Sequence, residues 1–352
     1  MDGLAESLGR SPELFPHVFD VRDDTVGLIR LTRAEYEKAS FLDQRVLTPR
    51  TIGRRVPWRE LSRAIEAAKL AERCGFIFHI GHVGSTLLSR LLGAHPAVFA
   101  LREPPILRTF ALIRADAEVQ PRAWSGSEFE ERLSGNLKLL SRSFEPGQAA
   151  VVKATSFVSG LAEEILRRDY KPKAVMIFVS PESYLATILA GPNSRQESRA
   201  FTPGRHKRLC TRIGREAWRL ASLSEGEALA LSWACEMSAL AAAARNAEGR
   251  VMRIDFDALL NEPESVLSAA FRHFDIDASR SEVLKIVEGP DMRRYSKAPE
   301  HAYDRELRHQ VLNSARARDG AEIRRGLAWL ERAAVEFPDI REAIEFSKLT
   351  NG

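Results

Sequence analysis

Residues 75–92, GFIFHIGHVGSTLLSRLL, decide the fold. The apolar run 76–80 predicts a short buried strand, and it leads through a glycine-containing loop into a leucine-rich helix. Gly81 and Gly84 allow a tight turn. The backbone amides from Gly84 to Leu87, at the start of the expected helix, should have no hydrogen-bond partner within it. These amides and the hydroxyls of Ser85 and Thr86 predict a phosphate-binding loop at a helix N-terminus. The alternative is a tight strand-to-helix turn that binds nothing.

The loop lacks the lysine of the nucleoside-triphosphatase pattern G-x-x-x-x-G-K-[ST]. That lysine contacts the β- and γ-phosphates of a bound triphosphate, so its absence disfavours a kinase or an ATPase. A kinase-like enzyme stays as an alternative, but it would also need a carboxylate for magnesium, and the sequence shows no such residue after a strand.

Length and composition indicate a large α/β domain with helical additions. The 352 residues carry a net charge of +4, which suits a small anionic ligand and does not predict a nucleic-acid partner. No apolar run is long enough to span a membrane, and the first ten residues are too polar for a signal peptide, so we expect a cytoplasmic protein. Cys74, Cys210 and Cys235 are far apart and predict neither a disulfide framework nor a metal site.

Four further apolar runs, at residues 98–101, 149–153, 173–179 and 250–255, predict strands that alternate with helices. The fold class expected is therefore α/β, with a mainly parallel five-stranded sheet flanked by helices and helical additions at both ends. We expect residues 1–74 to form an N-terminal extension, with a strand at 26–31 and a capping box from Thr32 to Glu35. Residues 75–290 form the core, and 291–352 add a basic loop and helices to the same domain.

Charged side chains follow two of the predicted strands. In an open α/β sheet ligands bind beyond the carboxyl ends of the strands, where Glu103 and Lys153 are expected. Glu103 is a candidate base, and Lys153 a candidate cation for an anionic ligand. The alternatives are a solvated ion pair between Arg102 and Glu103 and a surface lysine at position 153.

The loop and the segment after it resemble the sulfotransferases that use 3'-phosphoadenosine-5'-phosphosulfate. In that family Lys or Arg, Ser, Gly, Thr and Thr surround the 5'-phosphate, and the matching residues here are His82, Val83, Gly84, Ser85 and Thr86. The sequence A-H-P at 94–96, followed by a strand and a glutamate, is similar to the tyrosylprotein sulfotransferases. This resemblance covers about residues 75–277 and implies that Glu103 is the base acting on the acceptor.

The same resemblance locates the binding site for the 3'-phosphate. In the family, the arginine of an R-D-P turn and a serine eight residues later bind the 3'-phosphate. Aligning that turn on Pro181 places Val179 at the position of the arginine and Thr187 at the position of the serine. Arg195 is the expected substitute, in a loop or lid at 191–208. Arg293, Arg294 and Lys297 are further candidates in a basic loop.

The resemblance implies transfer of a sulfonyl group from 3'-phosphoadenosine-5'-phosphosulfate to a hydroxyl or amine of a small-molecule or peptide acceptor, without a metal. Cofactor-binding residues would be 82–87, Thr187 and Arg195, and the catalytic residues Glu103 and Lys153. A sulfotransferase-like binding protein without activity is the main alternative. Neither the acceptor nor the oligomeric state follows from the sequence.

Overall fold

The structure is a computed structural model that describes residues 2–116, 124–296, 300 and 302–348. Its strands form two sheets. The strands are β1 (Leu14–Asp20), β2 (Thr25–Arg30), β3 (Gly53–Pro57), β4 (Gly75–His79), β5 (Val98–Arg102), β6 (Ala149–Lys153), β7 (Ala174–Phe178) and β8 (Val251–Asp255).

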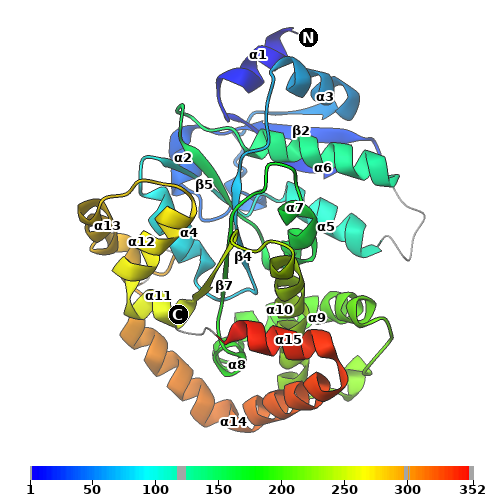
Figure 1. Cartoon of the computed structure of the whole chain (residues 1–352), viewed down its shortest axis with the longest axis vertical. Helices are drawn as coiled ribbons and strands as arrows, with labels where there is room; N and C mark the ends of the chain where they lie inside the picture. Colours follow the sequence, from blue (N-terminus) through cyan, green and yellow to red (C-terminus); the bar gives the residue numbers. More distant parts are fainter. Residues whose placement is uncertain (1, 117–123, 297–299, 301, 349–352) are drawn as a thin grey trace.

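Helices surround both sheets (Figure 1). The α-helices are α1 (Asp2–Arg10), α2 (Arg33–Lys38), α3 (Trp58–Ala67), α4 (Ser85–Gly93), α5 (Ile106–Asp116), α6 (Gly126–Leu140), α7 (Ala162–Leu166), α8 (Pro181–Leu189), α9 (Pro192–Ile213), α10 (Glu225–Arg245), α11 (Phe256–Asn261), α12 (Pro263–His273), α13 (Arg280–Val287), α14 (Arg305–Glu336) and α15 (Pro338–Ser347). Short 3₁₀ turns are η1 (Gln44–Val46), η2 (Ser156–Leu161), η3 (Leu220–Ser222) and η4 (Pro290–Arg293).

The central sheet has five strands in the order β5-β6-β4-β7-β8, and every neighbouring pair is parallel. This confirms the predicted fold class and the five predicted core strands. Strand β4 lies in the middle, so the loop that follows it leaves the sheet at the centre of its carboxyl edge. Because parallel strands end at the same edge, the residues after β4, β5, β6 and β8 converge there.

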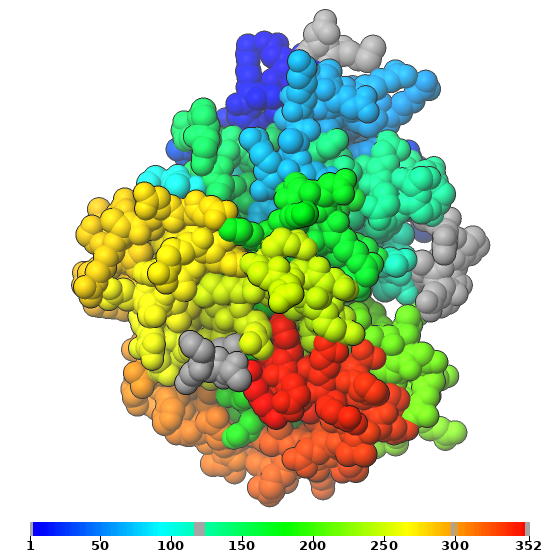
Figure 2. Space-filling model, in the orientation of Figure 1, coloured from blue at the N-terminus to red at the C-terminus, as the bar shows by residue number. Residues whose placement is uncertain are grey.

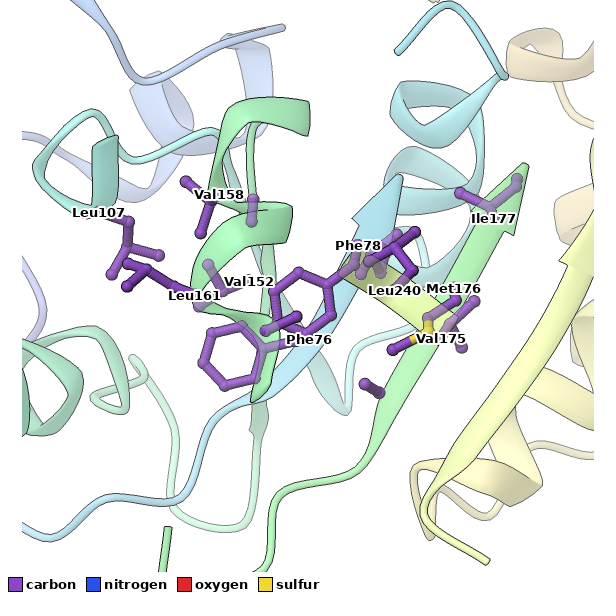
Figure 3. Packing of buried hydrophobic residues seen from close by; sticks show 14 of the residues in the cluster. Phe76, Phe78, Leu107, Val152, Val158, Leu161, Val175, Met176, Ile177 and Leu240 are labelled. Atoms are coloured by element: carbon purple, nitrogen blue, oxygen red, sulfur yellow. The ribbon is translucent and has the colours of Figure 1, made fainter. Parts of the chain in front are cut away.

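Helix α4 contacts β4, β5 and β6 and also packs against α12. The 3₁₀ turn η2 contacts β4 and α10. The rings of Phe76 and Phe78 are stacked with centroids 5.4 Å apart, and Figure 3 shows them in the same buried cluster as Val158 and Leu161 of η2 and Leu240 of α10. The strand residues are therefore buried from both sides, which explains why their sequences are apolar without alternation.

The second sheet is antiparallel, in the order β1-β2-β3, and lies at the N-terminal end of the molecule (Figure 1). Only β2 was expected from the sequence. Strand β1 contains Pro16 next to a register irregularity, and β3 reads GRRVP with a single buried residue, so neither has a clear strand pattern. The capping box predicted at Thr32 and Glu35 is present at the start of α2.

One expectation for the second half of the chain needs correction. Residues 191–208 do not form a loop or lid, because α9 runs from Pro192 to Ile213 and includes Pro203. The C-terminal helices expected after residue 291 are α14, which has a kink at Asp319 (φ −114°, ψ 18°), and α15. Pro192 begins α9 where proline is tolerated, since the first helical amide has no intrahelical partner.

The space-filling view shows the N-terminal segment in blue at one end of the molecule and α14 and α15, orange to red, at the other (Figure 2). Among the described residues, no helix is long and apolar enough to cross a membrane.

Candidate active site

A cavity of about 640 Å³ opens at the carboxyl edge of the central sheet. Its size is within the range of small-molecule and cofactor sites. Residues after β4, β5, β6 and β8 contribute to its wall, together with parts of α8, α9 and α14. The charged side chains that line it are Arg45, Arg108, Lys153, Arg205 and Arg308, against Asp43, Glu103 and Glu197.

The loop between β4 and α4 has the geometry expected of an anion cradle. Gly81, His82 and Gly84 all have positive φ values, of 88°, 56° and 69°. A Cβ atom on Gly84 would lie 1.9 Å from the ring of Phe256, so this position needs glycine for both backbone conformation and space. The loop is therefore held in its turn by close packing against α11.

The first turn of α4 presents unpaired donors to the cavity. The amide of Leu88 donates to the carbonyl of Gly84 at 3.1 Å, so the amides of Ser85, Thr86 and Leu87 precede the intrahelical bonds. The hydroxyl of Thr86 is 2% exposed and has no hydrogen-bond partner among the described residues. All three residues line the cavity, with Val83 and Gly84. This arrangement suits a phosphate or sulfate group.

Glu103 and Lys153 meet next to this loop. The Lys153 ammonium forms a salt bridge with the Glu103 carboxylate, and its side chain is 0% exposed. The amide of Glu103 donates to the carbonyl of Lys153 at 2.7 Å, which fixes the ends of β5 and β6 side by side. Glu103 has φ 56°, a left-handed conformation that is uncommon for a residue with a side chain. Strain of this kind is typical of functional sites.

His79, at the end of β4, lies near the same oxygen of the Glu103 carboxylate as Lys153. Its Nδ1 accepts a hydrogen bond from the amide of Gly81 at 3.0 Å, so a neutral ring carries its proton on Nε2. Nε2 lies 3.9 Å from Oε1 of Glu103. Glu103 thus faces the nitrogen atoms of two side chains, and no sequence motif singles out His79.

Arg102 points away from Glu103, so the solvated ion pair considered as an alternative is wrong. The buried guanidinium of Arg102 donates to the carbonyls of Ala39 at 2.6 Å and Glu37 at 3.1 Å. It therefore caps the C-terminal end of α2. Burial lowers the pKa of Arg102 to about 10, and the nearby charge of Arg90 acts in the same direction.

A second wall of the cavity lies beyond β8 and includes a residue from α14. Arg308 is 4% exposed and forms an ion pair with Asp257 at 2.8 Å. Its guanidinium lies 4.7 Å from the centroid of the Phe256 ring, the ring that packs on Gly84. Its Nη2 has no hydrogen-bond partner among the described residues. The tyrosines at 295 and 303, whose ring centroids are 5.5 Å apart, line the same side.

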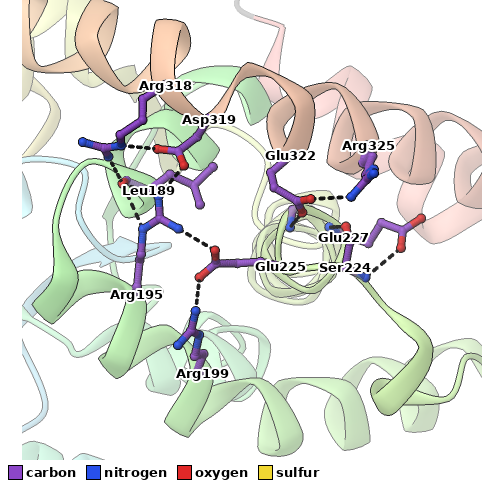
Figure 4. Close-up of polar contacts among 11 residues, drawn as sticks. Leu189, Arg195, Arg199, Ser224, Glu225, Glu227, Arg318, Asp319, Glu322 and Arg325 are labelled. Carbon is purple, nitrogen blue, oxygen red and sulfur yellow. Dashed lines mark hydrogen bonds and ion pairs between the residues drawn. The ribbon is translucent and has the colours of Figure 1, made fainter.

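Arg195 does not lie where the sequence suggested. It is absent from the cavity wall, and its guanidinium donates to the carbonyl of Leu189 and to Glu225, at 2.9 and 2.5 Å. It also forms an ion pair with Asp319 at 2.7 Å (Figure 4). Because the segment is a helix and not a lid, Arg195 ties α9 to α10 and α14 and cannot fold back over the cavity.

The remaining predicted site residues divide into two groups. Thr187 lines the cavity, and its hydroxyl donates to the carbonyl of Ser183 at 2.6 Å, which leaves its lone pairs available. His82 also lines it, with Nε2 3.4 Å from Glu197. Arg293 and Arg294 are exposed and do not line the cavity. Lys297 lies outside the described residues.

Val179 occupies a fully buried position and does not line the cavity. Its carbonyl accepts a hydrogen bond from Trp233 of α10 at 3.2 Å. This position therefore contributes no charge to the cavity wall. In the part of the chain that the structure describes, no group of three or more His, Cys, Asp or Glu residues is arranged to hold a metal ion.

Comparison with known proteins finds similarity in structure and none in sequence. No family model and no curated protein matches the chain. Among solved structures, the sulfotransferase domain from the curacin biosynthetic pathway is 15% identical with a TM-score of 0.40, and the match covers 66% of this chain and 85% of that one. The sulfotransferase domain from the Synechococcus PCC 7002 olefin synthase is 13% identical with a TM-score of 0.39, covering 80% and 96%. Sulfotransferase STF9 from Mycobacterium avium is 12% identical with a TM-score of 0.35, covering 70% and 76%.

Proposed function

We propose that this protein transfers a sulfonyl group from 3'-phosphoadenosine-5'-phosphosulfate to a hydroxyl or amine of an acceptor. The observation that carries the proposal is the meeting of two features in one cavity. The salt-bridged pair of Glu103 and Lys153 stands next to the free amides at the start of α4. A base, a buried cation and an anion cradle are the groups that such a transfer requires.

The residues present fit the phosphosulfate end of the donor. The amides of Ser85, Thr86 and Leu87, and the unpartnered hydroxyl of Thr86, would hold its 5'-phosphate. For the 3'-phosphate we infer Arg308 in place of Arg195, because its buried Nη2 lacks a partner and its guanidinium faces the same cavity. The Thr187 hydroxyl on α8 donates to the carbonyl of Ser183, so it would have to turn from that carbonyl to donate to this phosphate.

The donor supplies an activated sulfonyl group attached to a phosphate leaving group. Glu103 takes the proton of the acceptor hydroxyl or amine on its carboxylate. Lys153 holds this carboxylate in place and adds a buried positive charge where negative charge develops. The left-handed backbone at Glu103 directs its side chain back toward β6, where Lys153 ends the strand. Most of the catalytic effect would come from positioning these charges.

A binding protein without activity is the second candidate, and one observation favours it. His82 stands where the resemblance places a fixed cation, and its Nε2 lies 3.4 Å from Glu197. A loop histidine next to a carboxylate is a weaker anion ligand than a lysine or an arginine would be.

Turnover of the donor tests the proposal. The protein is mixed with 3'-phosphoadenosine-5'-phosphosulfate and a panel of phenols, alcohols and amines, and 3'-phosphoadenosine-5'-phosphate is measured by chromatography. We expect product that depends on both the protein and at least one acceptor. Binding of the nucleotide product without acceptor-dependent turnover across the panel would favour the non-catalytic candidate.

A further inference from the structure

One side of the cavity, which we call the acceptor wall, consists of Arg108, Phe157, Ser198, Phe201 and Arg205. Arg108 belongs to α5, which follows β5, and Phe157 belongs to η2, which follows β6. In the sheet order these strands lie on one side of β4, whereas β8, Phe256 and Arg308 lie on the other. Glu103 and Lys153 end β5 and β6. The acceptor wall is therefore on the side of the proposed base, away from Arg308.

Arg108 is a cation without an anionic partner. Its guanidinium lies 5.3 Å from the ring centroid of Phe201 and 5.8 Å from that of Phe157. It makes no side-chain hydrogen bond or ion pair with the described residues, in contrast to each acidic residue of the cavity wall, which has a basic neighbour. The two rings lie within cation–π range of this exposed side chain and leave its N–H groups free for a ligand.

Arg205 is a second cation of this wall, and a buried carboxylate that does not line the cavity holds its guanidinium group. Its Nε donates to Glu236 at 2.9 Å. Glu236 is 0% exposed and also accepts hydrogen bonds from Arg208, at 2.7 Å, and from Ser159. Burial alone would raise the pKa of Glu236, but the charges of Arg208 and Arg205 hold it below its usual value. One carboxylate thus balances the guanidinium groups of the buried Arg205 and the partly buried Arg208, and a positive charge is left over.

Ser198 lies one helical turn before Phe201 and is 3% exposed. Its hydroxyl has no hydrogen-bond partner among the described residues, although it lines the cavity. Buried hydroxyls are almost always paired in folded proteins, so this unpaired hydroxyl in the cavity wall is a candidate partner for a ligand. Ser198, Phe201 and Arg205 are spaced three and four residues apart and share one face of α9.

We propose that the acceptor wall binds the carboxylate of a small acceptor that also carries an apolar or aromatic part. That this ligand is the acceptor of the sulfonyl group rests on the function proposed above. The existence of the anion-binding site does not depend on that function. Guanidinium groups bind carboxylates through paired, charge-assisted hydrogen bonds, and the rings of Phe157 and Phe201 offer an apolar surface next to them. The donor must share the cavity of about 640 Å³, which limits the acceptor to a small molecule.

Three phenols that differ mainly in charge test this inference. They are 4-hydroxyphenylacetate, the neutral 4-hydroxyphenylacetamide and the cationic tyramine, each titrated calorimetrically into the protein with and without 3'-phosphoadenosine-5'-phosphate. We expect the native protein to bind the carboxylate roughly tenfold or more tightly than the amide, and tyramine most weakly. Arg108→Gln should remove most of this preference, and Arg108→Glu should reverse it toward tyramine.

Arg114→Gln is the matched control, since Arg114 lies on the same helix, pairs with Glu164 and does not line the cavity. It should bind all three phenols as the native protein does. Because the side chain of Arg108 makes no hydrogen bond with the described residues, its variants should fold normally, which the thermal midpoint will verify. Equal affinity for the acid and the amide, no binding of 4-hydroxyphenylacetate, or equal effects of the Arg108 and Arg114 variants would overturn the proposal.

The same titrations separate this inference from the proposed function. If the carboxylate preference depends on Arg108 while 3'-phosphoadenosine-5'-phosphate does not bind, the anion site stands and the donor assignment fails. If the nucleotide binds and the phenols show no charge preference, the acceptor wall fails and the donor assignment stands.

Discussion

At the scale of single residues, Glu103 and Lys153 could be found from the sequence because each directly follows an apolar run that predicts a parallel strand. What the sequence could not show is that they form a salt bridge with each other, 50 residues apart, while Arg102 turns toward α2. The backbone at Glu103 adopts a left-handed conformation, which no residue pattern around it indicates. The left-handed conformation is energetically unfavourable, and it occurs at a position where the carboxylate must face the cavity.

Replacing Glu103 by Gln removes the base and keeps the size of the side chain. Turnover should fall about a hundredfold or more, while affinity for 3'-phosphoadenosine-5'-phosphate stays nearly unchanged. Glu66→Gln, at an exposed position of α3, is the control and should change neither quantity. Full activity in the Glu103 variant would exclude this residue as the base.

Arg308 is the residue that we expect to recognise the 3'-phosphate. Arg308→Gln should weaken binding of 3'-phosphoadenosine-5'-phosphate roughly tenfold or more and leave adenosine 5'-phosphate unaffected. Since this change leaves Asp257 without its partner, Arg308→Lys is the companion variant, which keeps the charge and should lose less. If the affinities for both nucleotides fall equally, Arg308 supports the fold and does not recognise the 3'-phosphate.

At the scale of elements, the strand-loop-helix unit around β4 and α4 was predictable because all its signals are local. The apolar strand, the glycines and the leucine stripe stand within 18 residues. Helix α9 was not predictable in this way. Its buried residues are Ser198, Thr202, Arg205 and Leu209, so the face that packs inward has one apolar side chain and no hydrophobic period. Its Gly, Pro, Asn and Ser residues then resemble a loop.

The glycine loop can be tested with two glycines that share a conformation. Gly84 and Gly147 both have positive φ, but a Cβ at Gly147 meets no atom within 4 Å, whereas one at Gly84 meets the ring of Phe256. Gly147→Ala should lower the free energy of unfolding by about 1 to 2 kcal/mol, the cost of the left-handed backbone. Gly84→Ala should lower the free energy of unfolding by about 1 to 3 kcal/mol more, because of overpacking, and should also weaken nucleotide binding. Similar losses of stability in both variants, measured by denaturant unfolding, would contradict the packing described for the loop.

Arg195 should act on stability and not on ligand choice. Arg195→Ala removes the contacts with Leu189, Glu225 and Asp319, so the free energy of unfolding should fall by about 1 to 3 kcal/mol. The preference for 3'-phosphoadenosine-5'-phosphate over adenosine 5'-phosphate should not change. A selective loss of affinity for the first nucleotide would restore Arg195 as a phosphate ligand.

The stabilising effect of Arg195 should also depend on pH. Burial by itself would raise the pKa of Asp319, but its bonds to Arg195 and Arg318 hold the pKa below the usual value. A carboxyl with a depressed folded-state pKa contributes stability above its unfolded pKa and loses it as the pH falls through the folded one. The difference between the native protein and Arg195→Ala should therefore shrink below about pH 4. A constant difference down to strong acid would show that Asp319 is not involved.

At the scale of the whole molecule, the sequence predicted the central sheet and the loop at its edge but not the closure of the cavity. Phe256 and Arg308 join the cavity wall from segments more than 150 residues further along the chain than the loop, and Arg205 joins it from α9. Contacts between residues so far apart in the chain leave no local sequence pattern. These residues could therefore be identified only from the folded structure. The charge surplus of the cavity is equally invisible in a net charge of +4 for the chain.

The central claim is that the cavity is built for the nucleotide of 3'-phosphoadenosine-5'-phosphosulfate. The most direct measurement is calorimetric titration of the native protein with 3'-phosphoadenosine-5'-phosphate, adenosine 5'-phosphate and ATP with magnesium, since it needs no knowledge of the acceptor. The first nucleotide should bind tightest, by roughly tenfold or more over adenosine 5'-phosphate, because only it carries a 3'-phosphate for Arg308. Equal binding of these two nucleotides, or tighter binding of ATP with magnesium, would contradict the account.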